Sequence, residues 1–272
     1  QFVSIPGAGA GFRSGEYAGI QSSEMEREHM AGEKKPLIQI RQLSKSFGDV
    51  HALRSVSLEV PENAIFGFLG PNGAGKTTLM KILLGLVRPS SGGGEIFGLD
   101  IVEDSVAIRE RIGFLPQHPS FIEHMSAREN MLFSAEFYYS GPDHLIRNRC
   151  DDMLELVGLA EKADRPVGGF SGGEKQRLGI ALAQINQPDL LVLDEPASAL
   201  DPLGRQAVLE VMERLKENTT IFYSTHILDD VQRVSDTVAI LNQGVLAASG
   251  PIGQIVQGGY GVVYSVLVKG PS

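Results

Sequence analysis

Residues 70–78 read GPNGAGKTT, and the rest of the chain can be placed by reference to them. Glycines at 70, 73 and 75 free the backbone from Cβ obstruction, so that successive N–H groups can point inward. An apolar stretch at residues 64–69 precedes the glycines, and apolar residues at helical spacing follow at 79–87. The sequence therefore predicts a buried strand, an anion-binding loop and a helix in succession.

The spacing G-x-x-x-x-G-K-[ST] gives individual residues of this P-loop different tasks. Backbone N–H groups at a helix start favour phosphate, Lys76 would reach the β- and γ-phosphates, and the Thr77 hydroxyl would bind Mg²⁺. The alternative, a glycine turn with an exposed lysine, does not explain the flanking strand and helix. The predicted phosphate-contacting residues are Gly70, Pro71, Asn72, Gly73, Ala74, Gly75, Lys76, Thr77 and Thr78.

Composition limits the possible classes of function. The 272-residue chain can bury a large core, and its formal net charge of -9 argues against a general nucleic-acid binder. Cys150 is the only cysteine, so an intrachain disulfide is impossible and a reducing compartment fits. No apolar run approaches the ~20 residues that span a bilayer, and no signal-peptide pattern is visible. Any membrane role would therefore require another chain.

The two ends of the chain differ from its middle. Residues 1–35 mix Gly, Ser, Glu and Arg without periodicity, which predicts a disordered tail or a leader, and Met30 is the hypothetical natural start. Residues 36–268 are expected to form one domain. The chain stops at residues 269–272, just after a predicted strand at 262–268, which suggests a truncated C-terminal continuation.

FSGGEKQR, residues 170–177, is the second informative stretch. Ser171 and Glu174 have the spacing of a capping box, and Gly172 and Gly173 leave the helix start open to an anion. An ordinary helix cap is the plainer interpretation. However, two glycines in a first turn cost helix stability, which favours a functional reason for them.

Asp194 and Glu195 follow a continuous apolar run at residues 190–193, which Asp189 precedes. Such a run is typical of a central parallel strand, and active groups gather at the carboxyl ends of these strands. Asp194 suits a Mg²⁺ ligand, and Glu195 suits a general base toward an attacking water. The alternative is a solvated pair of acids.

Three further side chains are candidates for the same site. Phe47 could stack on adenine or could be a strand-end core residue. Gln117 ends a predicted strand and can offer both an amide oxygen and N–H groups, although such a residue is usually solvated. His226 follows the predicted strand at 219–225 and could donate to a γ-phosphate, or it could be an exposed loop histidine.

Several segments outside the motifs carry predictions of their own. Residues 89–94 are expected to form a loop before a short strand at 95–98, and residues 238–241 and 244–247 are expected to form peripheral strands. Residues 126–139 begin with a capping box and predict a helix that is apolar nearly all round. Part of that helix is therefore expected to dock a partner. A second, amphipathic helix is expected near residues 144–157.

These motifs occur in the order and approximate spacing of an ABC-transporter nucleotide-binding subunit, and the chain resembles that family from Leu37 to Val268. In detail it resembles the separately encoded ATPases of ABC-2-type exporters. The resemblance implies an α/β P-loop NTPase of the ABC-ATPase fold. That fold combines a RecA-like parallel-sheet core with an antiparallel β subdomain and an inserted α-helical subdomain, here at about residues 118–186.

The resemblance also implies roles for single residues. Phe47 matches the aromatic residue that stacks adenine, and Gln117 matches the glutamine near Mg²⁺ and the transporter interface. Ser171, Gly172 and Gly173 match the signature that meets a γ-phosphate held by the opposite subunit. Asp194 matches the Mg²⁺ aspartate, Glu195 the catalytic base, Asp201 the D-loop aspartate and His226 the switch histidine. Phe170 and Glu174 depart from the Leu and Gln often found there, which leaves the substrate class open.

The resemblance also implies an assembly of several chains. The chain holds one P-loop and one signature, so it is expected to pair head to tail with a second ATP-binding subunit, preferably its own copy, around two ATP molecules. A transmembrane permease would dock near His118 to Tyr139, on the inner face of the cell membrane. Two alternatives are a soluble clamp ATPase acting on the ribosome or DNA and a regulatory module without hydrolysis. The clamp usually has two cassettes or a long coiled-coil insertion, and the regulatory module would not need Glu195 and His226.

Overall fold

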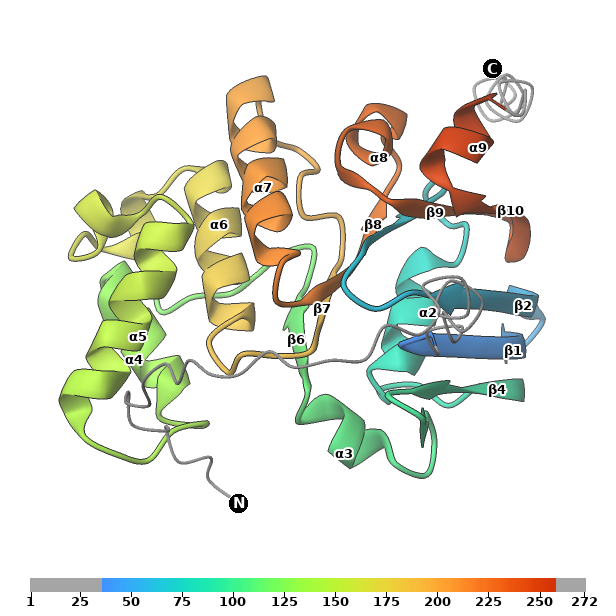
Figure 1. Ribbon diagram of the computed structural model, residues 1–272, viewed down its shortest axis with the longest axis horizontal. Helices are drawn as coiled ribbons and strands as arrows, with labels where there is room; N and C mark the ends of the chain where they lie inside the picture. Colours follow the sequence, from blue (N-terminus) through green and yellow to red (C-terminus); the bar gives the residue numbers. More distant parts are fainter. Residues whose placement is uncertain (1–35, 258–272) are drawn as a thin grey trace, which may run out of the picture.

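A six-stranded sheet runs through the middle of the computed structural model, which describes residues 36–257 (Figure 1). Its strand order is β10-β9-β3-β8-β7-β6, and every neighbouring pair is parallel except β10 with β9. All residues of β3, β7 and β8 are buried, as expected for parallel strands covered on both faces. The strands are β3 Ile65–Leu69, β6 Ile112–Leu115, β7 Leu190–Leu193, β8 Thr220–Thr225, β9 Thr237–Asn242 and β10 Val245–Pro251.

The stretch at residues 238–241 was expected to be peripheral, and this prediction is wrong. β9 lies between β3 and β10 inside the sheet, and Val238, Ala239, Ile240 and Leu241 are fully buried or nearly so. Of these two strands only β10 lies at an edge of the sheet, and β6 forms the opposite edge. The predicted strand at residues 262–268 and the predicted tail at 1–35 lie outside the described residues.

A smaller antiparallel sheet, β2-β1-β4-β5, packs on one side of the first. It consists of β1 Ile38–Phe47, β2 Val50–Val60, β4 Ser91–Ile96 and β5 Leu99–Asp100. The loop expected at residues 89–94 is wrong in part, because Gly92, Gly93 and Gly94 belong to β4. Cβ atoms at Gly92 and Gly94 would lie 2.2 Å and 2.5 Å from β1 carbonyl oxygens, so close pairing with β1 requires glycine there.

Eight helices cover the sheets in the part of the chain that the structure describes. Helices α4, α5 and α6 form a separate group at the end of the molecule opposite the small sheet (Figure 1). Helix α4 ends at residue 135, four residues before the predicted end. The helices are α2 Lys76–Leu83, α3 Ser105–Arg109, α4 Ala127–Ala135, α5 Asp143–Leu156, α6 Gly172–Ala183, α7 Pro202–Leu215, α8 Leu228–Val234 and α9 Ile252–Gln257, with 3-10 turns η1 Ala160–Lys162 and η2 Val167–Gly169.

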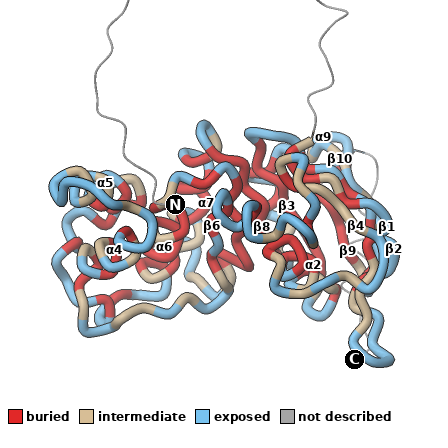
Figure 2. Tube along the Cα trace, turned by 90° about the horizontal axis from the view of Figure 1, so that it is seen from below, coloured by how far each residue is buried: buried red, intermediate tan, exposed pale blue. Residues whose placement is uncertain are grey.

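Two hydrophobic clusters meet at the six-stranded sheet. One joins its outer face to helices α4 to α8, and the other fills the space between the two sheets around Phe66, Phe68 and Phe222. Figure 2 shows buried residues concentrated along the central strands and α6, with exposed residues on the surrounding loops. The residues at the carboxyl ends of β3, β7 and β8 therefore follow strands that are packed tightly in the core.

Candidate functional site

The P-loop connects β3 to α2 and is pressed against two neighbouring strands. Gly75, with φ +109°, would place a Cβ 2.4 Å from the Ala52 carbonyl oxygen. A Cβ on Gly70 would lie 2.4 Å from the Leu241 carbonyl oxygen. Both contacts are with backbone and cannot be relieved by a side-chain rotation. The glycines thus let the loop turn into α2 with its backbone close to β2 and β9.

Lys76 places a buried cation at the start of α2. The residue is 5% exposed, and its Nζ donates to the carbonyl oxygens of Gly70 at 2.7 Å and Pro71 at 3.3 Å. It also lies 3.1 Å from Glu195 Oε1. A buried ammonium needs such partners because the loss of water is otherwise costly. The positive charge predicted for phosphate binding is therefore fixed beside the predicted general base.

Asp194 stands at the end of β7 between two hydroxyl groups. Its Oδ2 accepts a hydrogen bond from Thr77 Oγ1 at 3.1 Å, and its Oδ1 accepts one from Ser224 Oγ at 2.6 Å. Ser224 also accepts the backbone N–H of Glu195 at 2.9 Å. Sequence reasoning missed Ser224. Its position near the end of a predicted strand, two residues before His226, was the only signal for it.

Glu195 and His226 form a second contact at this edge, in which Glu195 is buried and the His226 side chain is 42% exposed. Glu195 Oε2 lies 2.7 Å from His226 Nδ1, and Glu195 has φ +51°, a conformation that residues other than glycine adopt rarely. Strained backbone of this kind is common at functional sites and is kept by surrounding structure. Here it directs the carboxylate toward both Lys76 and His226.

Lys76, Thr77 and Glu195 border an open cavity of about 590 Å³. A volume in this range suits a small-molecule ligand such as a nucleotide. Gln117 is part of the lining, as predicted. Sequence reasoning missed the β2 residues and Gln243. The cavity is lined by Val50, His51, Ala52, Arg54, Pro71, Asn72, Gly73, Gly75, Lys76, Thr77, Thr78, Gln117, Glu195 and Gln243.

Phe47 lies beside this cavity and is not part of its lining. The ring is 51% exposed, and Lys45 Nζ lies 4.8 Å from its centroid. Phe47 is paired with Val50 across the β1–β2 turn, and Val50 does line the cavity. The structure therefore places Phe47 on the rim, with an open aromatic face.

The Ser171 segment forms the start of α6 and lies outside the P-loop cavity. Ser171 Oγ accepts the Glu174 N–H at 3.3 Å, and Glu174 Oε2 accepts the Ser171 N–H at 2.7 Å, which confirms the predicted capping box. Burial raises the pKa of Glu174, but hydrogen bonds from Lys162 and Ser171 outweigh burial and lower it overall. The helix start is thus held firmly, with Ser171 and Gly172 exposed.

Asp201 belongs to the same surface as the Ser171 segment. It is exposed, and its Oδ1 caps α7 by accepting the Gly204 N–H at 3.1 Å. A Cβ on Gly173 would lie 3.4 Å from Gly204 Cα, so α6 and α7 begin side by side. The predicted site residues therefore fall into two groups, one around Lys76 and one around Ser171.

The donor set of the first group fits Mg²⁺ and phosphate. The Thr77 hydroxyl and the Asp194 carboxylate are adjacent oxygen donors of the kind Mg²⁺ prefers, and this ion usually takes its other ligands from water and phosphate. Among residues 36–257, no cluster of three or more His, Cys, Asp or Glu side chains could hold a metal by itself. A glycine loop, a buried lysine and strand-end carboxylates define a P-loop nucleoside triphosphatase.

Comparison with known proteins gives the family. The profile described as ABC transporter matches residues 53–198, more than half of the chain. An uncharacterized ABC transporter ATP-binding protein of Bacillus subtilis, YxlF, is 40% identical over 86% of this chain and 77% of its own. The bacitracin transport ATP-binding protein BcrA of Bacillus licheniformis is 40% identical over 77% of this chain and 68% of its own.

The fold has solved counterparts as well. The ATP-binding cassette MJ0796, solved as a dimer in a post-hydrolysis state with ADP and Pi, has a TM-score of 0.70 at 25% identity. The match covers 79% of this chain and 98% of the cassette. The chain belongs to the ABC transporter family and is an ATP-binding, ATP-hydrolysing subunit of it. Within residues 36–257, no helix is both long and apolar enough to cross a membrane.

Proposed function

We propose that this chain powers export through a separate transmembrane permease, by closing on ATP with a second copy of itself and reopening after hydrolysis. The observation that carries the proposal is the contact of Glu195 with both Lys76 and His226 at the P-loop. The relatives named above support the transport role, and one of them is called a bacitracin transport protein. The chain would then work in the cytoplasm, on the inner face of the membrane.

The proposed chemistry assigns one task to each side chain. Glu195 takes a proton from water as the water attacks the γ-phosphate, and His226 holds the carboxylate and donates toward the phosphate. Lys76 leaves Glu195 for the phosphate oxygens and stabilises their negative charge. Mg²⁺, held by Thr77, Asp194 and Gln117, would supply further positive charge at the phosphates. Phe47, on the rim, would stack on adenine.

The second group of residues completes the site from another chain. Ser171, Gly172, Gly173 and Asp201 lie outside the P-loop cavity of their own chain. Ser171 and Gly172 are exposed at the start of α6, which suits an anion, and Asp201 is exposed at the neighbouring start of α7. A head-to-tail dimer would bring this helix start of one chain to the P-loop of the other. The dimeric solved relative supports this arrangement.

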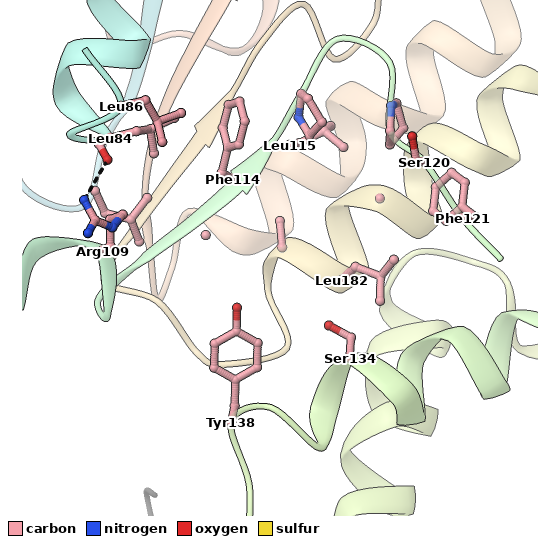
Figure 3. A pocket seen from close by; sticks show the side chains of 16 residues that line it. Leu84, Leu86, Arg109, Phe114, Leu115, Ser120, Phe121, Ser134, Tyr138 and Leu182 are labelled. Carbon is pink, nitrogen blue, oxygen red and sulfur yellow. Dashed lines mark hydrogen bonds between the residues drawn. The ribbon is translucent and has the colours of Figure 1, made fainter. Parts of the chain in front are cut away.

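An apolar cleft between the sheet and the helical group is the proposed permease contact. Its volume is about 480 Å³, and Phe114, Leu86 and Tyr138 line it with exposed side chains (Figure 3). Phe133 and Phe137 lie on the adjoining part of the surface, with their rings in edge-to-face contact at 5.3 Å. Exposed aromatic side chains gathered in this way are typical of protein interfaces. The predicted docking segment, His118 to Tyr139, supplies part of the cleft lining, and β6 and α6 supply most of the rest.

Replacement of the base tests the hydrolysis mechanism. We expect Glu195→Gln to lower the turnover of ATP by roughly 10²-fold, because the amide cannot accept the proton of water. Binding of a fluorescent ATP analogue should persist, whereas Lys76→Ala should weaken it. Arg233→Gln, an exposed change on α8, is the control and should leave both unchanged. Near-normal hydrolysis by Glu195→Gln would exclude Glu195 as the base.

Docking is tested by co-purification from membranes. The full chain should be recovered with a multi-span protein, and Phe114→Glu, which puts a charge into the cleft, should abolish that recovery while nucleotide binding persists. Recovery unaffected by Phe114→Glu would exclude the cleft as the contact.

A further inference from the structure

Asp230 is a buried carboxylate that the proposed hydrolysis mechanism does not use. It lies on α8, four residues after His226, and is 2% exposed. One oxygen forms an ion pair with Arg205 Nε on α7, and the other lies 3.5 Å from Thr225 Oγ1 at the end of β8. A single side chain thus contacts two segments that each border a part of the ATP site.

The β8 side of this contact leads to His226. Thr225 Oγ1, besides facing Asp230, accepts the backbone N–H of Ile227 at 3.0 Å, so the hydroxyl bridges the turn that carries His226. The Thr225 carbonyl oxygen also accepts the Gly70 N–H of the P-loop at 3.1 Å. The position of the His226 ring beside Glu195 therefore depends on a turn that Asp230 helps to hold.

The α7 side leads to Asp201. Arg205 is in the first turn of α7, and its backbone N–H donates to the Asp201 carbonyl oxygen at 2.9 Å. Asp201 caps the same turn through its side chain. A displacement of the Arg205 side chain would therefore shift the start of α7, where the exposed Asp201 lies.

Burial of the carboxylate keeps the Asp230–Arg205 ion pair together. Burial raises the pKa of Asp230, an effect that the Arg205 guanidinium and Thr225 oppose. A buried carboxylate is stable only with such partners, and loss of one partner leaves the other group desolvated and uncompensated. The Arg205 side chain is 27% exposed, so the cost of separating the pair falls mainly on the buried Asp230 carboxylate. The pair therefore fixes the distance between the start of α7 and the His226 turn.

We propose that Asp230 and Arg205 are positioning residues for ATP hydrolysis, which tie the His226 turn of one ATP site to the Asp201 segment that contributes to the other. The inference rests on the proposed two-chain site. It assigns to this ion pair a role in turnover and in communication between the sites, with no direct contact to ATP.

Asp230→Asn is the first test, in the full-length chain with steady-state ATP hydrolysis and fluorescent-nucleotide binding. The neutral isostere keeps the shape and loses the ion pair. We expect kcat to fall about tenfold while KM and nucleotide affinity stay within about twofold, since misplacement of the His226 turn affects the transition state more than binding. The Hill coefficient for ATP should also fall toward one. Asp230→Glu should recover part of kcat.

A second variant keeps the test valid if Asp230→Asn unfolds. Arg205→Met combined with Asp230→Leu replaces the pair by apolar side chains of similar volume, a change that buried ion pairs often tolerate. We expect this double variant to melt near the wild-type temperature and still to show the low kcat. Arg233→Gln is the matched control, because it removes an exposed arginine from the same helix, 3.7 Å from Glu210.

Two outcomes would overturn the inference. One is a double variant with wild-type kcat and Hill coefficient, and the other is a loss of kcat accompanied by an equal loss of nucleotide affinity. If the wild-type chain itself failed to hydrolyse ATP, the proposed function would fail instead, so the two failures are distinguishable.

Discussion

Buried charges at the P-loop are held in a shared arrangement in which each has a partner. Lys76 contacts two carbonyl oxygens and Glu195, Glu195 also contacts His226, and Asp194 accepts two hydroxyl donors. A preorganised set of this kind costs little reorganisation when charge develops on a phosphate. Because Lys76, Asp194 and Glu195 are buried, loss of one member of the set leaves a buried charge with one partner fewer.

Cys150 offers a prediction at the scale of one residue. It is fully buried on α5, and burial raises the pKa of its thiol to about 11. The native state therefore keeps the thiol proton at a pH where the unfolded state, with a pKa near 9.0, loses it. Because the native state then binds more protons, stability should fall as pH rises from about 9 to 11.

The thiol prediction is checked by labelling and by unfolding. A disulfide reagent should modify Cys150 slowly in the native chain and rapidly in urea, since the thiolate is the reactive form. Cys150→Ala should be less stable than wild type at about pH 8, because it leaves a small cavity, and the difference should narrow at higher pH. Fast native labelling, or a constant difference across that range, would contradict the prediction.

The motifs were sufficient to place Lys76, Thr77, Asp194, Glu195 and His226 at one site, because each lies at a strand end or a helix start that the sequence also predicts. Ser224 was missed because its role depends on β8 lying next to β7, an arrangement set by the sheet order. The β2 residues of the cavity wall were missed for a similar reason. They come from the small sheet, and only tertiary packing brings them to the P-loop.

Strand β6 and helix α6 pack against each other unusually closely. A Cβ on Gly113 of β6 would lie 2.0 Å from the Ala183 carbonyl oxygen, and one on Gly179 of α6 would lie 2.5 Å from Leu115 Cδ1. Both glycines thus allow the helix to pack on the strand. This contact fixes α6, and with it the Ser171 helix start, relative to the sheet.

Gly113→Ala should disrupt that contact. The new methyl group would meet backbone at the end of α6 and side chain at Leu191, so we expect a loss of about 2–4 kcal/mol in the free energy of unfolding. Gly93→Ala is the control, since a Cβ there has no neighbour within 4 Å and its effect should stay within about 1 kcal/mol. Urea unfolding followed by circular dichroism measures both. Equal stability of the two variants would show that β6 and α6 can separate at little cost.

Local signals predicted helix starts better than helix ends. The capping boxes at Ser126 and Ser171 are both formed as predicted. Helix α4 nevertheless ends before Tyr139, although the apolar pattern continues, and Tyr139 donates a hydrogen bond to the Ile185 carbonyl oxygen at 2.6 Å. That tertiary contact draws the chain onto the core and has no counterpart in the local sequence. The glycine run of β4 was misassigned because it pairs with a distant strand.

In the proposed two-chain mechanism, the molecule carries two incomplete halves of an ATP site at different places. The P-loop cavity is bounded by the P-loop and by β2 of the small sheet, and the Ser171 helix start lies with the helical group beside α7. Within one chain the Ser171 helix start is outside the P-loop cavity, and the β6–α6 contact holds α6 against the sheet. A second chain in the opposite orientation can supply the missing half to each site, as a twofold dimer requires.

Mixing two inactive variants tests this division of the site. Lys76→Ala removes the phosphate-binding cation, and Gly172→Glu puts a negative charge at the exposed helix start, where a Cβ meets only an ordinary contact with Leu200. Each variant alone should have little activity. A mixed dimer, however, contains one site with both lesions and one site with neither. With random pairing and independent sites, an equal mixture should therefore recover about a quarter of the wild-type rate.

Size-exclusion chromatography with ATP should show dimers in the mixture, and the hydrolysis rate should peak at equal proportions. Gly172→Glu chains that are fully active alone would show that one chain builds the whole site, and a mixture that regains nothing would rule out independent sites shared between chains.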